Sequence, residues 1–191
     1  MLETISMGLV CLALNVYHEA KNQPLEGQFA VADVVMNRVA DPRYPDTVCE
    51  VVKQGPVKES WRTRETPDPN DAEYFPVRHR CQFSWYCDGK SDKPRNQEAW
   101  LQAQTVAHVV ATQGSPGLTG GATHYHADYV QPEWASTKTF TTKIGDHLFY
   151  RWELPILEKL PDEEIENSSE KTLEIHADEF IIEVELVEEM Y

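Results

Sequence analysis

Three stretches with apolar residues at three- and four-residue spacing constrain the fold of this chain most. They cover residues 4–21, 24–39 and 96–113, and this spacing places the apolar side chains of each stretch on one face of an α-helix. Pro24 lies near the start of the second predicted helix, and Gly114 follows the third as a C-terminal cap. A helical core of this kind in a chain of 191 residues predicts one globular domain, with room for a short appendage.

The segments between these helices have weaker patterns. A short helix is expected over residues 47–54. Residues 55–80 have few apolar anchors and many prolines and charges, so we expect a long, mostly irregular segment. The short aromatic stretch 81–87 predicts a strand or a hairpin.

The C-terminal half is predicted to add β-structure. Residues 122–130 and 140–152 look extended, and Gly145-Asp146 resembles a two-residue hairpin turn. Helices and short strands together indicate an α+β fold.

Negative charge is concentrated at the C-terminal end. Residues 153–191 contain 14 Asp and Glu side chains against two Lys, a net charge of -12 out of -15 for the whole chain. This break predicts a folded domain over residues 1–154 and an acidic extension over 155–191. Apolar residues alternate with glutamates over 182–186. This spacing favours a strand, and we expect residues of about 172–187 to pack as a hairpin or an added strand on the domain or on a second copy. Self-association through the extension is therefore a prediction, and a solvated, disordered tail is the alternative.

The same charge excludes several classes of partner. A net charge of -15 argues against nonspecific binding to nucleic acid or to anionic membranes.

No apolar run approaches the roughly 18 residues that a membrane span needs, so we expect no membrane insertion. The N-terminus shows no basic region and no cleavage site, and we expect no Sec signal.

Glu19 is a candidate general acid because of its place on the first predicted helix. It lies three residues after Val16 and seven after Leu12, at the edge of the apolar stripe. Partial burial would raise the pKa of this carboxyl and keep it protonated near neutral pH. Cleavage of a glycosidic bond needs such an acid. The alternative is a helix-end glutamate paired with Lys21 or Arg38.

Histidines and tryptophans supply the other candidates. His124 and His126 alternate along a predicted strand and share one face. With His147 they could bind zinc, but no helical His-Glu-x-x-His pattern accompanies them, and we favour histidines that hydrogen-bond in a polar groove. Trp85 and Trp134 lie in predicted loops or edges, where an aromatic ring either stacks on a sugar or packs in the core.

Seven segments, in a common order, resemble the SleB/CwlJ-type cell-wall hydrolase family, which includes the catalytic domains of spore-cortex-lytic enzymes and of related phage lysins. The first segment is Ala-Leu-Asn-Val-Tyr-His-Glu-Ala-Lys at residues 13–21. The others are residues 27–39, 44–52, 81–89, 122–126, 132–135 and 147–151. The extension 155–191 has no counterpart, and the segment around residues 58–78 is longer than the family pattern predicts.

The resemblance implies a fold, a reaction and a set of site residues. The fold is lysozyme-like, with small β-hairpins forming one side of a glycan groove, and the reaction is cleavage of the MurNAc–GlcNAc β-1,4 bond of peptidoglycan. Glu19 matches the family's catalytic glutamate. The expected substrate contacts are Gln82, Phe83, Ser84, Trp85, Tyr125, His126 and Trp134. Cys81 and Cys87 flank this groove segment, and we expect at least one of them to be disulfide-bonded, whereas Cys11 is interpreted as a small buried hydrophobe.

The mechanism expected from this resemblance is that of a lytic transglycosylase, with Glu19 as acid and base and with no metal or organic cofactor. The chain is expected to be a phage endolysin, made in the cytoplasm and acting in the periplasm or cell wall. An inverting muramidase would need a second carboxylate, for which Asp128, Glu133 and Asp88 are candidates. A zinc-dependent N-acetylmuramoyl-L-alanine amidase and a noncatalytic glycan-binding module are further alternatives.

Overall fold

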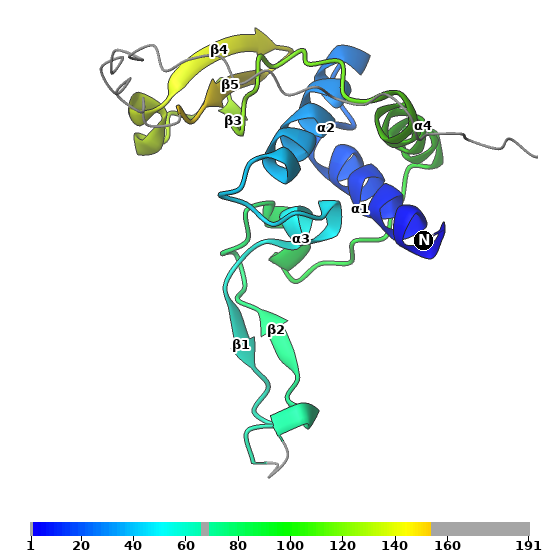
Figure 1. Ribbon diagram of the computed structural model, residues 1–191, viewed down its shortest axis with the longest axis vertical. Helices are drawn as coiled ribbons and strands as arrows, with labels where there is room; N and C mark the ends of the chain where they lie inside the picture. Colours follow the sequence, from blue (N-terminus) through cyan, green and yellow to red (C-terminus); the bar gives the residue numbers. More distant parts are fainter. Residues whose placement is uncertain (1, 66–68, 154–191) are drawn as a thin grey trace, which may run out of the picture. The chain divides into compact units, whose positions relative to one another are not determined.

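Four α-helices form the body of the fold. The computed structural model describes residues 2–65 and 69–153. The helices are α1 (Leu2–Ala20), α2 (Leu25–Ala40), α3 (Val48–Lys53) and α4 (Gln97–Gln113) (Figure 1). Helix α1 contacts each of the other three. All four helices predicted from the sequence are therefore confirmed.

The apolar stripes of these helices meet in one core. Their buried members are Leu12, Val16 and Tyr17 of α1, Ala32 and Val35 of α2, Val51 and Val52 of α3, and Val106 and Val110 of α4. Asn96 caps α4 by accepting a hydrogen bond from the amide of Ala99, and Gly114 ends it at a φ of 86°. The periodicity and the end signals of the sequence thus fix where the helices lie and which face they bury.

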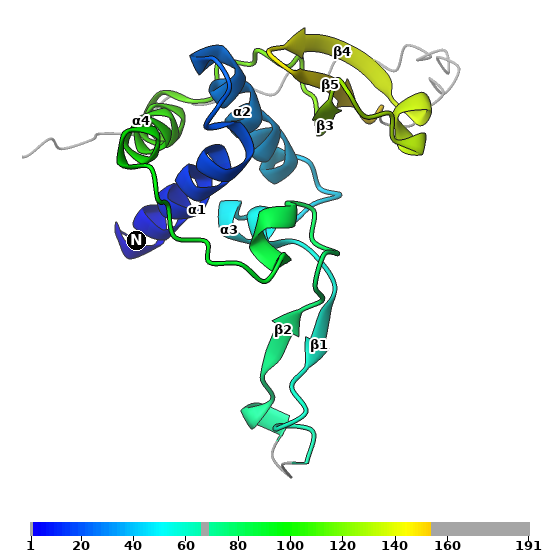
Figure 2. The same cartoon turned by 180° about the vertical axis from the view of Figure 1, so that it is seen from behind.

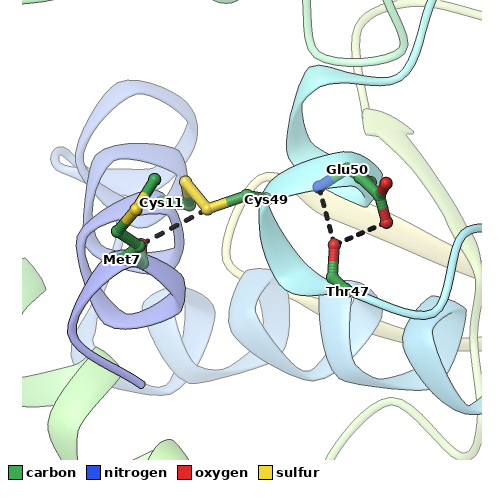
Figure 3. The surroundings of a disulfide bond; sticks show 5 residues. All are labelled: Met7, Cys11, Thr47, Cys49 and Glu50. Atoms are coloured by element: carbon green, nitrogen blue, oxygen red, sulfur yellow. Dashed lines mark hydrogen bonds between the residues drawn. A yellow bond between two sulfur atoms is a disulfide. The ribbon is translucent and has the colours of Figure 1, made fainter. Parts of the chain in front are cut away.

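A disulfide ties α3 to α1. Cys49 is bonded to Cys11, and Figure 3 shows this bond beside the N-terminal cap of α3. There the Thr47 hydroxyl accepts from the amide of Glu50 and donates to its carboxylate. The interpretation of Cys11 as a small buried hydrophobe is therefore wrong. Helical periodicity reports that a residue is buried, and it does not report a covalent partner 38 residues away.

The segment expected to be irregular contains a small hairpin. Strands β1 (Val57–Glu59) and β2 (Tyr74–Pro76) pair antiparallel with Lys58 opposite Phe75 (Figure 2). A short 3₁₀ turn, Pro69–Asp71, precedes β2. The expectation holds for most of 55–80, but strands of three residues are too short to show an alternating pattern in the sequence.

The prediction of a strand or hairpin over residues 81–87 is wrong. Ser84–Cys87 is a 3₁₀ helix, and Cys81 is bonded to Cys87. Six steps of an extended strand would span about 20 Å, whereas the Cα atoms of the two cysteines are 6.1 Å apart. The disulfide closes a small ring, and the helical turn fits inside it.

A three-stranded antiparallel sheet packs on α2. Its strands are β3 (His124–Ala127), β4 (Thr139–Ile144) and β5 (His147–Arg151), in the order β3-β5-β4. Gly145, at a φ of 58°, makes the predicted turn between β4 and β5. On the inner face of the sheet, Phe149 packs against Ala30 and Val34 of α2. Register places Tyr125 opposite Phe149, so His124 and His126 are on the outer face.

The acidic extension lies outside the described residues. The domain boundary at 154/155, the strand at 182–186 and self-association through the extension therefore stay predictions. Within residues 2–65 and 69–153, no helix has both the length and the apolar character that a membrane crossing requires.

Candidate active site

The candidate acid, Glu19, meets a tyrosine from the sheet. Glu19 is half-buried in the last turn of α1. Tyr125 points from the inner face of β3 toward the helices, and its hydroxyl donates a hydrogen bond to Glu19 Oε2 at 3.0 Å. The alternation of β3 is responsible for this contact, because it turns Tyr125 inward and the flanking histidines outward.

Burial sets the protonation of both groups. Burial raises the pKa of Glu19 above its ordinary value, and this effect outweighs the opposing hydrogen bond from Tyr125 and the positive charge of Arg38. Burial and the nearby Glu19 carboxylate raise the pKa of Tyr125 well above its ordinary value. Tyr125 therefore stays a phenol that donates, while Glu19 holds its proton to higher pH than an exposed glutamate does.

Arg38 is buried beside Thr123, Phe83 and Tyr44 and does not form the close ion pair with Glu19 that the sequence left open. Its Nε donates to the carbonyl of Thr123 at 2.7 Å. Its guanidinium lies over the rings of Phe83 and Tyr44, at 5.1 and 5.3 Å from their centroids. Arg38 acts on Glu19 through its charge. Lys21, the other suggested partner of Glu19, lies over the ring of Tyr17.

The segment predicted to line the groove is held in a closed loop. Phe83 is 2% exposed, whereas its neighbours Gln82 and Ser84 are exposed. The Cys81–Cys87 disulfide confirms the predicted covalent tie and joins the two cysteines to each other. The amide of Gln82 also donates to the carbonyl of Gln54 at 2.9 Å. Phe83 is thereby fixed under the guanidinium of Arg38.

Trp85, which was expected to contact substrate, packs in the core. It is 9% exposed, and its Nε1 donates to Asn15 Oδ1 at 3.1 Å. The ring of His18 stacks on it at a centroid distance of 4.6 Å. A ring covered in this way offers no free face to a sugar, so Trp85 supports the end of α1 instead.

His126 and Trp134 lie together on the outer face of the sheet. The two rings are 5.5 Å apart, and His124 is 5.3 Å from Trp134. A hydrogen bond of 3.1 Å joins His126 Nε2 to the hydroxyl of Tyr150. Of the three predicted contacts from this half of the chain, the structure thus brings Tyr125 against Glu19, and it places the other two on the opposite face of β3.

The three histidines suggested as zinc ligands do not converge. His147 is buried on the inner face, with its ring 5.0 Å from that of Tyr125, whereas His124 and His126 are on the outer face. Burial lowers the pKa of His124 to about 4, so this imidazole is neutral at pH 7. Among residues 2–65 and 69–153, no three His, Cys, Asp or Glu side chains are grouped as a metal site.

Sequence reasoning missed the importance of Arg38 and Tyr44. From the sequence, Arg38 is expected only as an ion-pair partner of Glu19. A signal was present, because Arg38 follows Val31 by seven residues and Val35 by three and so lies on the buried side of α2. A charged residue on an apolar stripe is unusual and marks a candidate functional group.

Comparison with known proteins identifies relatives that match up to 72% of this chain. A family model described as cell wall hydrolase matches residues 22–150; Glu19 lies just before this segment. A spore cortex-lytic enzyme of Oceanobacillus iheyensis is 49% identical over 141 residues, which cover 72% of this chain and 39% of that enzyme. One of Bacillus subtilis is 46% identical over 41 residues, covering 22% of this chain and 13% of the enzyme. The chain thus spans less than half the length of these relatives.

Two solved structures share the fold. One is the catalytic domain of the germination-specific lytic transglycosylase SleB from Bacillus anthracis, with 27% identity and a TM-score of 0.51, covering 75% of this chain and 93% of that chain. The other is the catalytic domain of the Bacillus cereus SleB protein, with 26% identity and a TM-score of 0.50, covering 76% and 91%. These neighbours confirm the predicted lysozyme-like α+β fold. Together with the match over residues 22–150, they show that this chain belongs to the cell wall hydrolase family.

Proposed function

We propose that this chain cleaves the glycan strands of peptidoglycan at the MurNAc–GlcNAc β-1,4 bond as a lytic transglycosylase. One observation carries the proposal: Glu19 is a half-buried carboxyl with a raised pKa that is oriented by the hydroxyl of Tyr125. The family match and a structural neighbour described as a lytic transglycosylase support it. The chain covers nearly all of that neighbour's catalytic domain.

The reaction needs one carboxyl that acts twice. Protonated Glu19 donates its proton to the glycosidic oxygen as the bond between that oxygen and C1 of MurNAc breaks. The GlcNAc fragment leaves with a hydroxyl group. The C6 hydroxyl oxygen of MurNAc then bonds to C1, and the Glu19 carboxylate takes the proton that this hydroxyl loses. The product is 1,6-anhydro-MurNAc, no water is consumed, and Glu19 is protonated again.

The hydrogen bond from Tyr125 assigns different tasks to the two carboxyl oxygens. Oε2 accepts from the Tyr125 hydroxyl at 3.0 Å, so the transferable proton is on Oε1. The raised pKa of Tyr125 keeps its phenol as a donor during the cycle. Tyr125 therefore fixes the rotation of the carboxyl and stabilises the carboxylate that forms after proton donation.

The remaining residues predicted to contact substrate form two groups in this proposal, one beside Phe83 and one on the outer face of the sheet. The exposed side chains of Gln82 and Ser84 flank the fixed ring of Phe83 and are proposed to contact sugars near the scissile bond. His126 and Trp134, on the outer face of the sheet, are proposed to contact the glycan strand farther away, where an aromatic ring supports a sugar face. Phe83 and Trp85 are left out because the core covers both rings: Phe83 is 2% exposed and Trp85 9% exposed.

An inverting muramidase would need a second carboxylate that activates water, about 6.5–9.5 Å from the acid. Asp128 is engaged by Lys143 at 2.7 Å. Asp88 accepts from the amide of Lys90. The single-carboxyl route fits these surroundings better.

The proposed place of action is the cell wall, outside the cytoplasm. Two disulfides in the described part of the chain suit an oxidising compartment. We propose an endolysin released by a phage as the finer interpretation. Expression in the cytoplasm of a Gram-negative host should leave the cells intact until the inner membrane is permeabilised, and rapid lysis without permeabilisation would contradict this interpretation.

Digestion of purified peptidoglycan in water enriched in heavy oxygen tests the reaction. A transglycosylase releases 1,6-anhydro products without heavy oxygen, whereas a muramidase releases reducing MurNAc that carries the label at C1. Free stem peptides, with activity lost to EDTA and restored by zinc, would show the amidase. Binding to the polymer without any product would show a glycan-binding module.

A further inference from the structure

Arg38 has an environment that packing alone does not explain. Its side chain is in the last turn of α2 and is only 5% exposed. Among the residues that the structure describes, its Nη1 is buried with no hydrogen-bond partner. A buried, unsatisfied donor on a charged group costs stability. An apolar residue on this stripe would avoid that cost, so the charge itself calls for an explanation.

Three separate segments fix the guanidinium of Arg38. The carbonyl of Thr123, next to β3, accepts from Nε at 2.7 Å. Phe83 comes from the loop closed by the second disulfide, and Tyr44 comes from the chain after α2; their rings lie 5.1 and 5.3 Å from the guanidinium carbon. These contacts hold a permanent positive charge in place, because arginine stays protonated in proteins.

We propose that Arg38 is a positioning residue of the active site, whose fixed charge favours the Glu19 carboxylate that forms when the proton is donated. This inference rests on the proposed function and deepens it. A carboxyl that donates a proton and later takes it back must be able to exist both as the neutral acid and as the carboxylate. Burial alone favours the neutral acid and therefore opposes donation. Arg38 offsets that effect from inside the protein, where a charge is weakly screened.

The charged and polar groups around Glu19 support this role. Tyr125 from β3 and Arg38 from α2 both lower the pKa of Glu19, against the larger effect of burial. On α1 itself, His18 stacks on Trp85 and Lys21 lies over the ring of Tyr17. Neither of these two neighbours is among the groups that shift the pKa of Glu19. Among the residues that the structure describes, Arg38 is thus a cation that acts on the acid.

The test follows the titration of the Glu19 carboxyl carbon by NMR in the wild type, Arg38→Gln and Arg38→Lys. The Gln amide can still donate to Thr123 but carries no charge. In Arg38→Gln we expect Glu19 to titrate at higher pH, and kcat on the pH-independent plateau below that titration to fall about tenfold or more with KM little changed. The alkaline limb of the activity profile should move up with the titration. Arg38→Lys should lie between the two, because it keeps the charge and loses the planar fork.

Arg151→Gln is the matched control, since it removes an exposed arginine whose partner is Glu153. Its Glu19 titration should coincide with that of the wild type. The proposal is overturned if Glu19 titrates at the wild-type pH in folded Arg38→Gln or, should that variant not fold, in Arg38→Met, which also removes the charge and keeps an apolar stem. The titration of Glu19 needs no turnover. A wild type that releases no transglycosylase products would overturn the proposed function, and the titration would still test the effect of Arg38 on Glu19.

Discussion

The Tyr125 hydroxyl donates to Glu19 Oε2 at 3.0 Å across 106 positions of sequence. This bond joins the end of the first helix to the edge strand of the sheet, the two parts of the fold that carry the site. It leaves one carboxyl oxygen free to exchange a proton. Both groups are shielded from water, so their interaction is stronger than it would be at the surface.

Replacing Tyr125 by Phe removes this donor and keeps the ring. The hydrogen bond lowers the pKa of Glu19, so its loss should raise that pKa further and move the alkaline limb of kcat to higher pH. We expect kcat on the pH-independent plateau below that limb to fall about tenfold or more, because a hydrogen bond to the developing carboxylate is lost. Tyr129→Phe, at a tyrosine that is 84% exposed, is the control. Identical pH profiles for Tyr125→Phe and the wild type would contradict the assignment.

The raised pKa of Glu19 makes a prediction about stability. A carboxyl whose folded pKa lies above its unfolded value binds more protons in the folded state, so it lowers stability as the pH rises between the two values. Glu19→Gln removes this penalty and can still accept from Tyr125. We expect the variant to have a higher Tm than the wild type at pH 7, and the difference to vanish well below the ordinary glutamate pKa of 4.5. A lower Tm at pH 7 would contradict the burial of the acid.

Removal of the first disulfide should mainly lower stability, and removal of the second should mainly lower activity. Loop entropy predicts a loss of about 4 kcal/mol when the Cys11–Cys49 bond, with a sequence separation of 38, is removed, and about 2 kcal/mol for Cys81–Cys87, with a separation of 6. The second bond, however, holds Phe83 under Arg38. Paired Cys→Ala variants should therefore show the larger loss of stability for the first bond and the larger loss of kcat for the second. Urea unfolding and turnover measure the two quantities, and the reverse order in kcat would contradict the role of the loop.

Trp134 tests the proposed outer contact. Trp134→Ala should raise KM several-fold for long glycan strands and leave kcat on short fragments unchanged, because the ring is on the opposite face of β3 from Glu19. Phe140→Ala, at an exposed ring on strand β4, serves as comparison. Equal KM values for Trp134→Ala and the wild type on long strands would remove Trp134 from the binding surface.

The helices could be predicted because their signals are local. Leu12 and Val16 repeat at helical spacing, Asn96 caps α4, and Gly114 ends it. The sequence also places Glu19 at the edge of the apolar stripe of the first helix, and this position predicts its partial burial. The inward direction of Tyr125 follows from the alternation of β3 once the strand is known.

The remaining features depend on contacts that are distant in sequence. Cys11 lies on a helix that any small apolar residue would suit, and only the fold brings it to Cys49. Trp85 is in a loop by sequence, yet Asn15 and His18 cover its ring. Periodicity describes one element at a time, so it identifies buried faces and leaves their partners open.

Glu19 as the single acid and base is tested most directly by mass spectrometry of peptidoglycan digested by the wild type and by Glu19→Gln. Gln keeps the shape of the side chain and cannot give or retake the proton. The wild type should release 1,6-anhydro-muropeptides, and a folded Glu19→Gln variant should lose roughly 10²–10⁴-fold in rate, the usual worth of general acid–base catalysis. Near wild-type release of these products by folded Glu19→Gln would contradict the role of Glu19.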